Sequence, residues 1–115
     1  MTDIIYKILP DALWKAAETQ GQFDGASIDL TDGYIHFSTV RQVRETAARH
    51  FTGQSDLVLV AVKADRLGDD LKWEPSRGGD LFPHLYGSLM LDHVLSVQPL
   101  GLGADGLHRF PDDLR

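Results

Sequence analysis

The chain has 115 residues, of which 17 are acidic and 11 basic, so its formal net charge is −6 at neutral pH. Hydrophobic residues make up 43% and charged residues 24%, as is typical of a single soluble globular domain. The sequence contains no cysteine, which excludes disulfides, thiolate metal ligands and a cysteine nucleophile. We therefore expect one packed, cytoplasmic domain.

Charge and hydropathy also narrow the classes of partner. The basic residues are scattered and the balance is acidic, which weighs against a nucleic-acid partner held by phosphate charge. The longest apolar run, Leu57 to Val62, is far shorter than a membrane-spanning helix, and the first residues do not resemble a secretory leader. We expect a small-molecule ligand, no membrane association, and a monomer or weak homodimer.

The first part of the chain predicts a strand, a helix and a loop. Ile4 to Leu9 is rich in β-branched and aromatic residues and stops at a proline, which indicates a strand. Asp11 to Gln20 has an acidic start and strong helix formers, and it is followed by Gly21, as expected of a short amphipathic helix. Residues 21–33 contain three glycines and little periodicity, so we expect a long loop that could cover a site.

Residues 34–38 predict a second strand whose two faces differ. Because side chains alternate along a strand, Ile35 and Phe37 share an apolar face. Tyr34, His36 and Ser38 share the opposite face, which is suited to chemistry. The sequence therefore predicts that these three polar side chains point the same way.

A capping box predicts the next helix. Thr39 and Gln42 match the pattern in which the first residue caps the helix and the glutamine reaches back to its amide, and the apolar stripe then runs to Phe51 and stops near Gly53. His36 would then lie just before a helix N-terminus, where free amides favour an anion.

The remaining elements follow from shorter patterns. Residues 56–63 are almost continuously apolar and predict a central strand covered on both faces. Further expectations are a polar turn (64–70), a short extended segment (71–74), an irregular loop (75–80), an edge strand or ordered turn (81–87), and a final strand (94–100). We interpret 1–100 as one domain and 101–115 as a C-terminal tail.

Two histidines are the first candidates for chemistry. His36 lies on the polar face of its strand, and His84 lies in an aromatic segment flanked by proline and glycine. The structural alternative is that each is a core histidine whose ring is satisfied by one hydrogen bond. The histidines show no metal-ligand spacing, so no metal site is predicted.

Other candidates are less specific. Glu74 stands beside Trp73, which could raise its pKa or build a pocket wall, but it is equally consistent with a surface carboxylate. Arg77 could clamp a phosphate or carboxylate, or be a solvated loop charge. Tyr34 and Tyr86 could stack on a planar ligand or serve as packing residues.

These residues carry a family resemblance over about residues 4–100. The segments Asp32-Gly-Tyr-Ile-His-Phe-Ser-Thr39 and Leu81-Phe-Pro-His-Leu-Tyr-Gly87, together with Ile5-Tyr-Lys-Ile8, Gln42 and Trp73-Glu74, resemble the family called domain of unknown function 952. That family is similar to the ADP-ribosyltransferase-like group. The resemblance implies an α+β fold with a split antiparallel or mixed β-sheet, two main helices and a cleft for NAD.

The resemblance also implies site residues. Lys7, His36 and Ser38 would face the cleft beside Tyr34, and Lys7 stands where active transferases carry His or Arg. Residues 83–85 occupy the position that often carries a catalytic glutamate. The resemblance implies that the catalytic residues are His36, His84 and Glu74. It implies NAD as the candidate cofactor, bound by Lys7, Tyr34, Ser38, Arg77 and Tyr86.

The sequence is consistent with three functions. The first is an ADP-ribosyltransferase-like protein that binds or cleaves NAD or a related nucleotide. The second is a non-enzymatic small-molecule or nucleotide-binding module. The third is a hydrolase or isomerase with His36 and His84 as acid and base. A convergent histidine pair would favour an enzyme, whereas singly buried histidines would favour a structural role.

Overall fold

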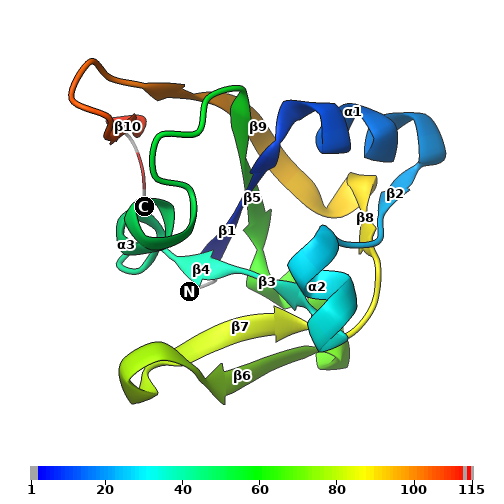
Figure 1. Ribbon diagram of the computed structural model, residues 1–115. Coiled ribbons are helices and arrows are strands. Elements are labelled where there is room, and N and C mark those ends of the chain that lie inside the picture. Colours follow the sequence, from blue (N-terminus) through cyan, green and yellow to red (C-terminus); the bar gives the residue numbers. More distant parts are fainter. Residues whose placement is uncertain (1–2, 113, 115) are drawn as a thin grey trace.

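The computed structural model describes residues 3–112 and 114 (Figure 1). The α-helices are α1 (Asp11–Gln20), α2 (Ser27–Asp32) and α3 (Val43–His50), and the 3-10 helices are η1 (Ala64–Asp70), η2 (Arg77–Gly79) and η3 (Leu91–His93). The strands are β1 (Ile4–Pro10), β2 (Gln22–Phe23), β3 (Ile35–His36), β4 (Ser38–Thr39), β5 (Leu57–Lys63), β6 (Leu71–Pro75), β7 (Leu81–Leu85), β8 (Leu89–Met90), β9 (Val94–Leu102) and β10 (His108–Arg109).

The strands form three antiparallel sheets. The largest has the order β10-β9-β5-β1-β4, a second has the order β3-β7-β6, and β2 pairs with β8. Figure 1 shows the β6–β7 hairpin below the five-stranded sheet, with β3 and β4 between them. Every strand pair in the described chain is antiparallel, so the predicted α+β class is confirmed with antiparallel sheets, whereas α2 adds a third α-helix to the two that were expected.

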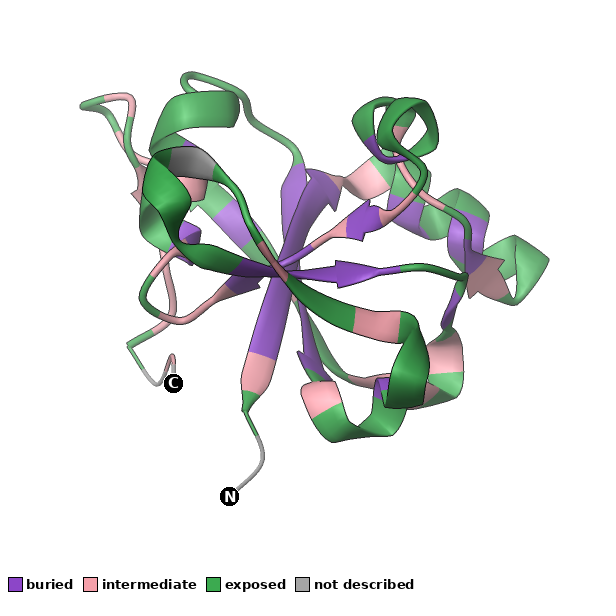
Figure 2. Cartoon of the chain, turned by 90° about the horizontal axis from the view of Figure 1, so that it is seen from below, coloured by how far each residue is buried: buried purple, intermediate pink, exposed green. Residues whose placement is uncertain are grey.

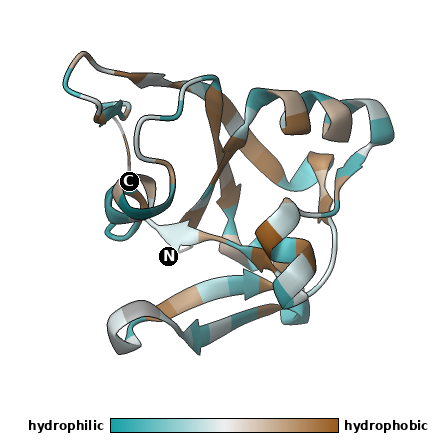
Figure 3. Ribbon diagram, viewed as in Figure 1, coloured by the Kyte–Doolittle hydropathy of each residue, from teal (hydrophilic) through white to brown (hydrophobic). Residues whose placement is uncertain are grey.

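The five-stranded sheet separates two apolar clusters. Alternation along β1 places Ile5 and Leu9 in one cluster, and Tyr6 and Ile8 in the other. The central strand β5, predicted from its apolar run, is buried from Leu57 to Val62. Figure 2 shows buried strands at the centre with exposed helices and loops around them, and Figure 3 shows hydrophobic residues along β5 and β9.

The predicted strand over residues 34–38 is broken at Phe37. The ring of Phe37 is buried, and its backbone N–H donates to the carbonyl of Pro83 at 3.0 Å. On one side of this break β3 pairs with β7, and on the other side β4 pairs with β1. The chain therefore passes from one sheet to the other here, and the prediction of one continuous strand is wrong.

Two further expectations need correction. Residues 21–33 are not a plain loop, because they contain β2 and α2. The segment 81–87 supplies β7, which lies in the middle of its sheet and not at an edge. Pro83 is tolerated there because its carbonyl points toward Phe37. Its nitrogen points to that same side, so no hydrogen bond to β6 is lost.

The capping box and the C-terminal boundary differ in detail from the predictions. The side chain of Gln42 accepts the N–H of Thr39 at 3.0 Å, as predicted, but α3 begins only at Val43. At the other end, β9 continues to Leu102 and pairs with β10, so the sheet extends past residue 100. Among the described residues, no helix combines the length and apolar composition needed to cross a membrane.

Candidate functional site

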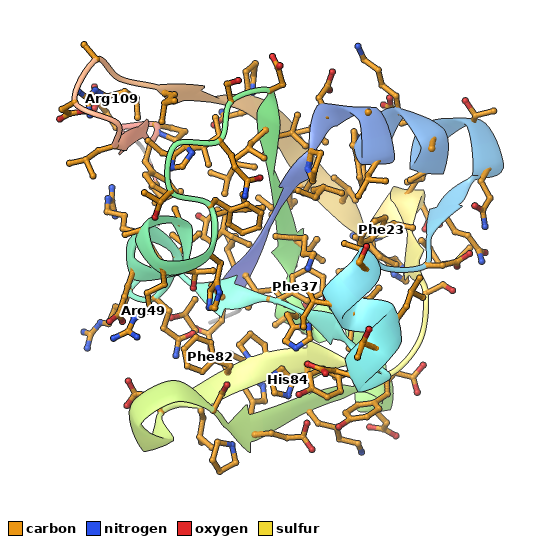
Figure 4. The ribbon with its side chains drawn as sticks, viewed as in Figure 1. Phe23, Phe37, Arg49, Phe82, His84 and Arg109 are labelled. Carbon is orange, nitrogen blue, oxygen red and sulfur yellow. The ribbon has the colours of Figure 1, made fainter. Side chains whose placement is uncertain are left out.

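Pairing of β3 with β7 sets the two candidate histidines opposite each other. His36 and His84 are register partners, so their side chains leave the same face of this sheet. Their ring centroids lie 5.5 Å apart in an edge-on arrangement. Figure 4 shows His84 on β7, near the end of the strand that approaches α2. The structure therefore brings the two histidines into one cluster.

Two aspartates of α2 hold the ring of His36. Asp29 Oδ1 lies 2.7 Å from Nδ1, and Asp32 Oδ2 lies 2.9 Å from Nε2. Asp29 also accepts the backbone N–H of His36 at 3.1 Å. Because carboxylates only accept, both contacts are satisfied together only by an imidazole that carries hydrogen on each nitrogen.

Asp29 is itself the centre of a buried network. Its oxygens lie 3.0 Å from Nζ of Lys7, and one accepts the N–H of Ala26 at 2.8 Å. Burial raises the pKa of Asp29, but its hydrogen bond with His36, the charge of Lys7 and the two backbone amides outweigh burial and bring the pKa to about 2. Burial lowers the pKa of Lys7, opposed by Asp29. Asp29 is thus held as a carboxylate.

A carboxylate of β6 holds the second histidine. Oε1 of Glu74 lies 2.7 Å from Nδ1 of His84 and also accepts the hydroxyl of Tyr86 at 2.7 Å. These two hydrogen bonds lower the pKa of Glu74. The bond to Glu74, together with desolvation and its negative charge, raises the pKa of Tyr86 to about 12. Glu74 therefore orients one imidazole and keeps Tyr86 a neutral donor.

Tyr34 packs against both histidines. Its ring centroid lies 4.1 Å from that of His84 in a stacked arrangement, 4.6 Å from that of His36 and 5.2 Å from that of Tyr86. Desolvation and the nearby charges of Asp32 and Glu74 raise the pKa of Tyr34. A substrate that contacts both imidazoles must displace this ring.

Lys72 adds a positive charge to this cluster. It is the register partner of His84 and lies two residues before Glu74, so all three side chains share one face of the sheet. Lys72 is exposed, and it forms no hydrogen bond or ion pair with the described residues. Its charge contributes to the lowered pKa of Glu74. Lys72 is therefore available to an anionic group.

Two of the predicted residues lie elsewhere or are already engaged. Ser38 is buried in β4, where its hydroxyl pairs with that of Thr46 at 2.8 Å, because the break at Phe37 separates it from His36. Lys7 is 6% exposed and directed at Asp29, so it faces the network and not solvent. The side chain of Arg77 lies outside the described residues.

Three members of the cluster, Asp29, Asp32 and Lys72, were not predicted from the sequence. Asp29 and Asp32 lie in residues 21–33, where the three-residue spacing of the aspartates on a short helix was the available signal. Lys72 could have been found from alternation, since it precedes Glu74 by two positions in an extended segment. Among the described residues, no group of three or more histidine or acidic side chains is arranged to hold a metal ion.

The chemical capacity of the cluster is proton transfer. A histidine whose Nδ1–H donates to a carboxylate presents the lone pair of Nε2 as a base, and Glu74 sets His84 in that tautomer. His84 is 3% exposed, and its Nε2 forms no hydrogen bond within the described chain. Asp29 and Asp32 engage both ring nitrogens of His36, so a substrate exchanges a proton with this ring only where it replaces Asp32, the more exposed of the two carboxylates. The two rings therefore differ in how they are available to a substrate.

Fold and site together define an antiparallel α+β domain with a histidine–carboxylate cluster. The chain belongs to the family described as "Protein of unknown function (DUF952)", which matches residues 8–97. The crystal structure of protein CC0527 from Caulobacter crescentus is similar to it, with 53% identity, a TM-score of 0.93, and coverage of 96% of this chain and 97% of that one. A solution NMR structure of CC0527 is 55% identical, with a TM-score of 0.82 and 90% coverage of each chain. No curated protein matches significantly.

Proposed function

We propose that this protein is an enzyme that transfers protons between a small-molecule substrate and the pair His36 and His84. The observation that carries the proposal is the convergence of two imidazoles, each with Nδ1 at 2.7 Å from a carboxylate and with ring centroids 5.5 Å apart. A histidine serving only as core packing needs one partner and no neighbouring acid–base group.

The substrate class we propose is a nucleotide, with NAD as the first candidate. The family resemblance to ADP-ribosyltransferase-like proteins supports this class. Tyr86, with 42% of its surface exposed, offers a ring for stacking, and Lys72 offers a charge for phosphate. In NAD hydrolysis, water attacks the ribose carbon while the bond to nicotinamide breaks and its electron pair leaves with nicotinamide. His84 would take the proton of that water.

A second candidate is a binding module that uses the same cluster without turnover. The observation that favours it is the position of Tyr34, whose ring fills the space beside both imidazoles. A planar ligand that stacks on Tyr34 would stay apart from the histidines. Binding and turnover therefore have to be measured separately.

The test combines a thermal-shift screen against NAD, ADP-ribose and other nucleotides with an assay for nicotinamide release. A ligand that binds only the folded state raises the midpoint temperature of thermal unfolding by mass action. We expect a shift with NAD and release that falls at least about 100-fold in His36→Ala and in His84→Gln, because general acid–base groups contribute such factors. His93→Ala, which changes a histidine that pairs with Asp92 outside the cluster, should match the wild type.

Three outcomes would contradict the proposed activity on NAD. A shift without nicotinamide release would support the binding module. No shift with any nucleotide would exclude this ligand class and leave the acid–base pair to be tested on other metabolites. Release that survives in both histidine variants would place the chemistry elsewhere in the molecule.

A further inference from the structure

A second concave site lies on the opposite face of the five-stranded sheet. Alternation along β1 directs Lys7 toward the histidine cluster and Tyr6 to the other face. On that other face is a cavity of about 300 Å³. Its lining consists of Ile4, Tyr6, Leu59, Ala61, Lys63, Leu95, Ser96, Gln98, Pro111 and Leu114. The cavity therefore shares no residue with the histidine cluster.

The cavity exists because this part of the sheet face has no helix over it. Its floor comes from β1, β5 and β9, and its wall comes from Pro111 and Leu114 of the C-terminal segment. No residue of α3 contributes to the lining, although Val43 and Ala47 of that helix pack on the same apolar cluster. The register of β5 with β1 and β9 fixes the positions of the floor residues.

The chemistry of the lining divides between its floor and its rim. Leu59 and Ala61 are buried and give an apolar floor. At the end of β5, Lys63 is exposed and forms no hydrogen bond or ion pair with the described residues. The side chains of Ser96 and Gln98 likewise form no hydrogen bond within the described chain. An apolar surface thus ends at one free cation and two free polar groups.

We propose that this cavity binds a small amphipathic carboxylate, the apolar chain lying on Leu59 and Ala61 and the carboxylate meeting Lys63. A volume of about 300 Å³ is at the lower end of the range for small-molecule sites, which suits a short chain. The charge of Lys63 selects an anion over a neutral molecule of the same shape. Ser96 and Gln98 supply further hydrogen-bond donors to the oxygens.

The test is a titration of the ¹⁵N-labelled protein with hexanoate and, separately, with the neutral analogue 1-hexanol, followed by NMR. We expect saturable shifts of the Ile4, Ala61 and Ser96 amides with a Kd of about 1 mM or lower. Hexanol should bind roughly tenfold more weakly because it forms no charge-assisted hydrogen bond. The amides of His36 and His84 should not move.

Matched variants distinguish binding in the cavity from nonspecific effects of removing a lysine. Lys63→Gln keeps the length of an exposed side chain, so the fold should persist, and it should weaken hexanoate roughly tenfold while leaving hexanol unchanged. Ala61→Leu should abolish binding of both compounds, because the larger side chain fills the floor of the cavity. Lys15→Gln, on the exposed face of α1, should bind like the wild type. Equal affinity for the two compounds, unchanged binding to Lys63→Gln, or shifts centred on His84 would overturn the proposal.

Discussion

At the scale of single residues, Asp29 organises one half of the candidate site. It is 2% exposed, and it joins Lys7, His36 and two backbone amides. A buried lysine is tolerated only with such a partner, because desolvation of an unpaired charge costs several kcal/mol. The ion pair between Lys7 of β1 and Asp29 of α2 therefore determines the position of His36.

Replacing Asp29 by asparagine should destabilise the protein by about 3 kcal/mol, because the charge of Lys7 would remain buried without its partner. The measurement is urea denaturation monitored by tryptophan fluorescence, which reports on the buried Trp14 as well as the exposed Trp73. Glu45→Gln is the matched control, since Glu45 pairs with Arg49 at an exposed position and should change stability by less than about 0.5 kcal/mol. Equal effects of the two substitutions would contradict the role given to Asp29.

The pH dependence of stability follows from the same carboxylate. The pKa of Asp29 is about 2 in the folded state and lies below its ordinary value of 3.8, so the folded state favours the ionised form. The resulting stabilisation is complete above pH 4 and is lost as the pH falls through about 2.

The difference in unfolding free energy between wild type and Asp29→Asn should therefore narrow by roughly 2 kcal/mol between pH 5 and pH 2. Urea titrations across this range measure it, and acid effects common to both proteins cancel. A difference that stays constant with pH would show that ionisation of Asp29 contributes nothing.

At the scale of elements, the turn from α2 into β3 positions Tyr34 and His36. Gly33 ends α2 with φ of 88° and donates its N–H to the carbonyl of Asp29 at 2.8 Å. This left-handed conformation disfavours residues that carry a Cβ. The glycine thus allows the helix that supplies the aspartates to turn directly into the strand that supplies the histidine.

Gly33→Ala should cost about 1 kcal/mol by backbone strain alone, because a Cβ at this position meets no atom within 4 Å. Gly101→Ala is the control: its Cβ would also lie in open space and its φ is outside the left-handed region, so its effect should be within about 0.5 kcal/mol. Thermal or urea unfolding distinguishes them, and a Gly33→Ala variant as stable as Gly101→Ala would contradict the strain argument.

The sequence predicted elements well where one local pattern dominates. The apolar run of β5 and the acidic start and terminal glycine of α1 identified both elements near their observed bounds. It failed at Phe37, because the break between β3 and β4 depends on a hydrogen bond to Pro83, 46 positions away along the chain. A tertiary contact of this kind leaves no local signal.

At the scale of the whole molecule, the candidate site is assembled from separate segments. His36 and Glu74 were singled out individually by residue type, but their shared cluster depends on the order β3-β7-β6, which places His84 between them. Lys7 joins from the larger sheet through Asp29. The family resemblance grouped His36, His84 and Glu74 in one site, but the sheet order that brings them together is set by packing of distant segments, which no local sequence pattern predicts.

The second face of the central sheet holds a separate candidate site, the cavity lined by β1, β5 and β9. The cavity and the histidine cluster lie on opposite sides of β1, and Lys63 and Lys72 are the free charges that each presents among the described residues. The two sites can therefore be tested one at a time.

Long-range ¹H–¹⁵N NMR of the histidine side chains measures whether Glu74 sets His84 as a base. We predict that neutral His84 carries its hydrogen on Nδ1, which donates to Glu74, and that this preference is lost in Glu74→Ala. His93, outside the cluster, should be unaffected by the substitution. A hydrogen on Nε2 of His84 in the wild type, or the same tautomer with and without Glu74, would contradict the account.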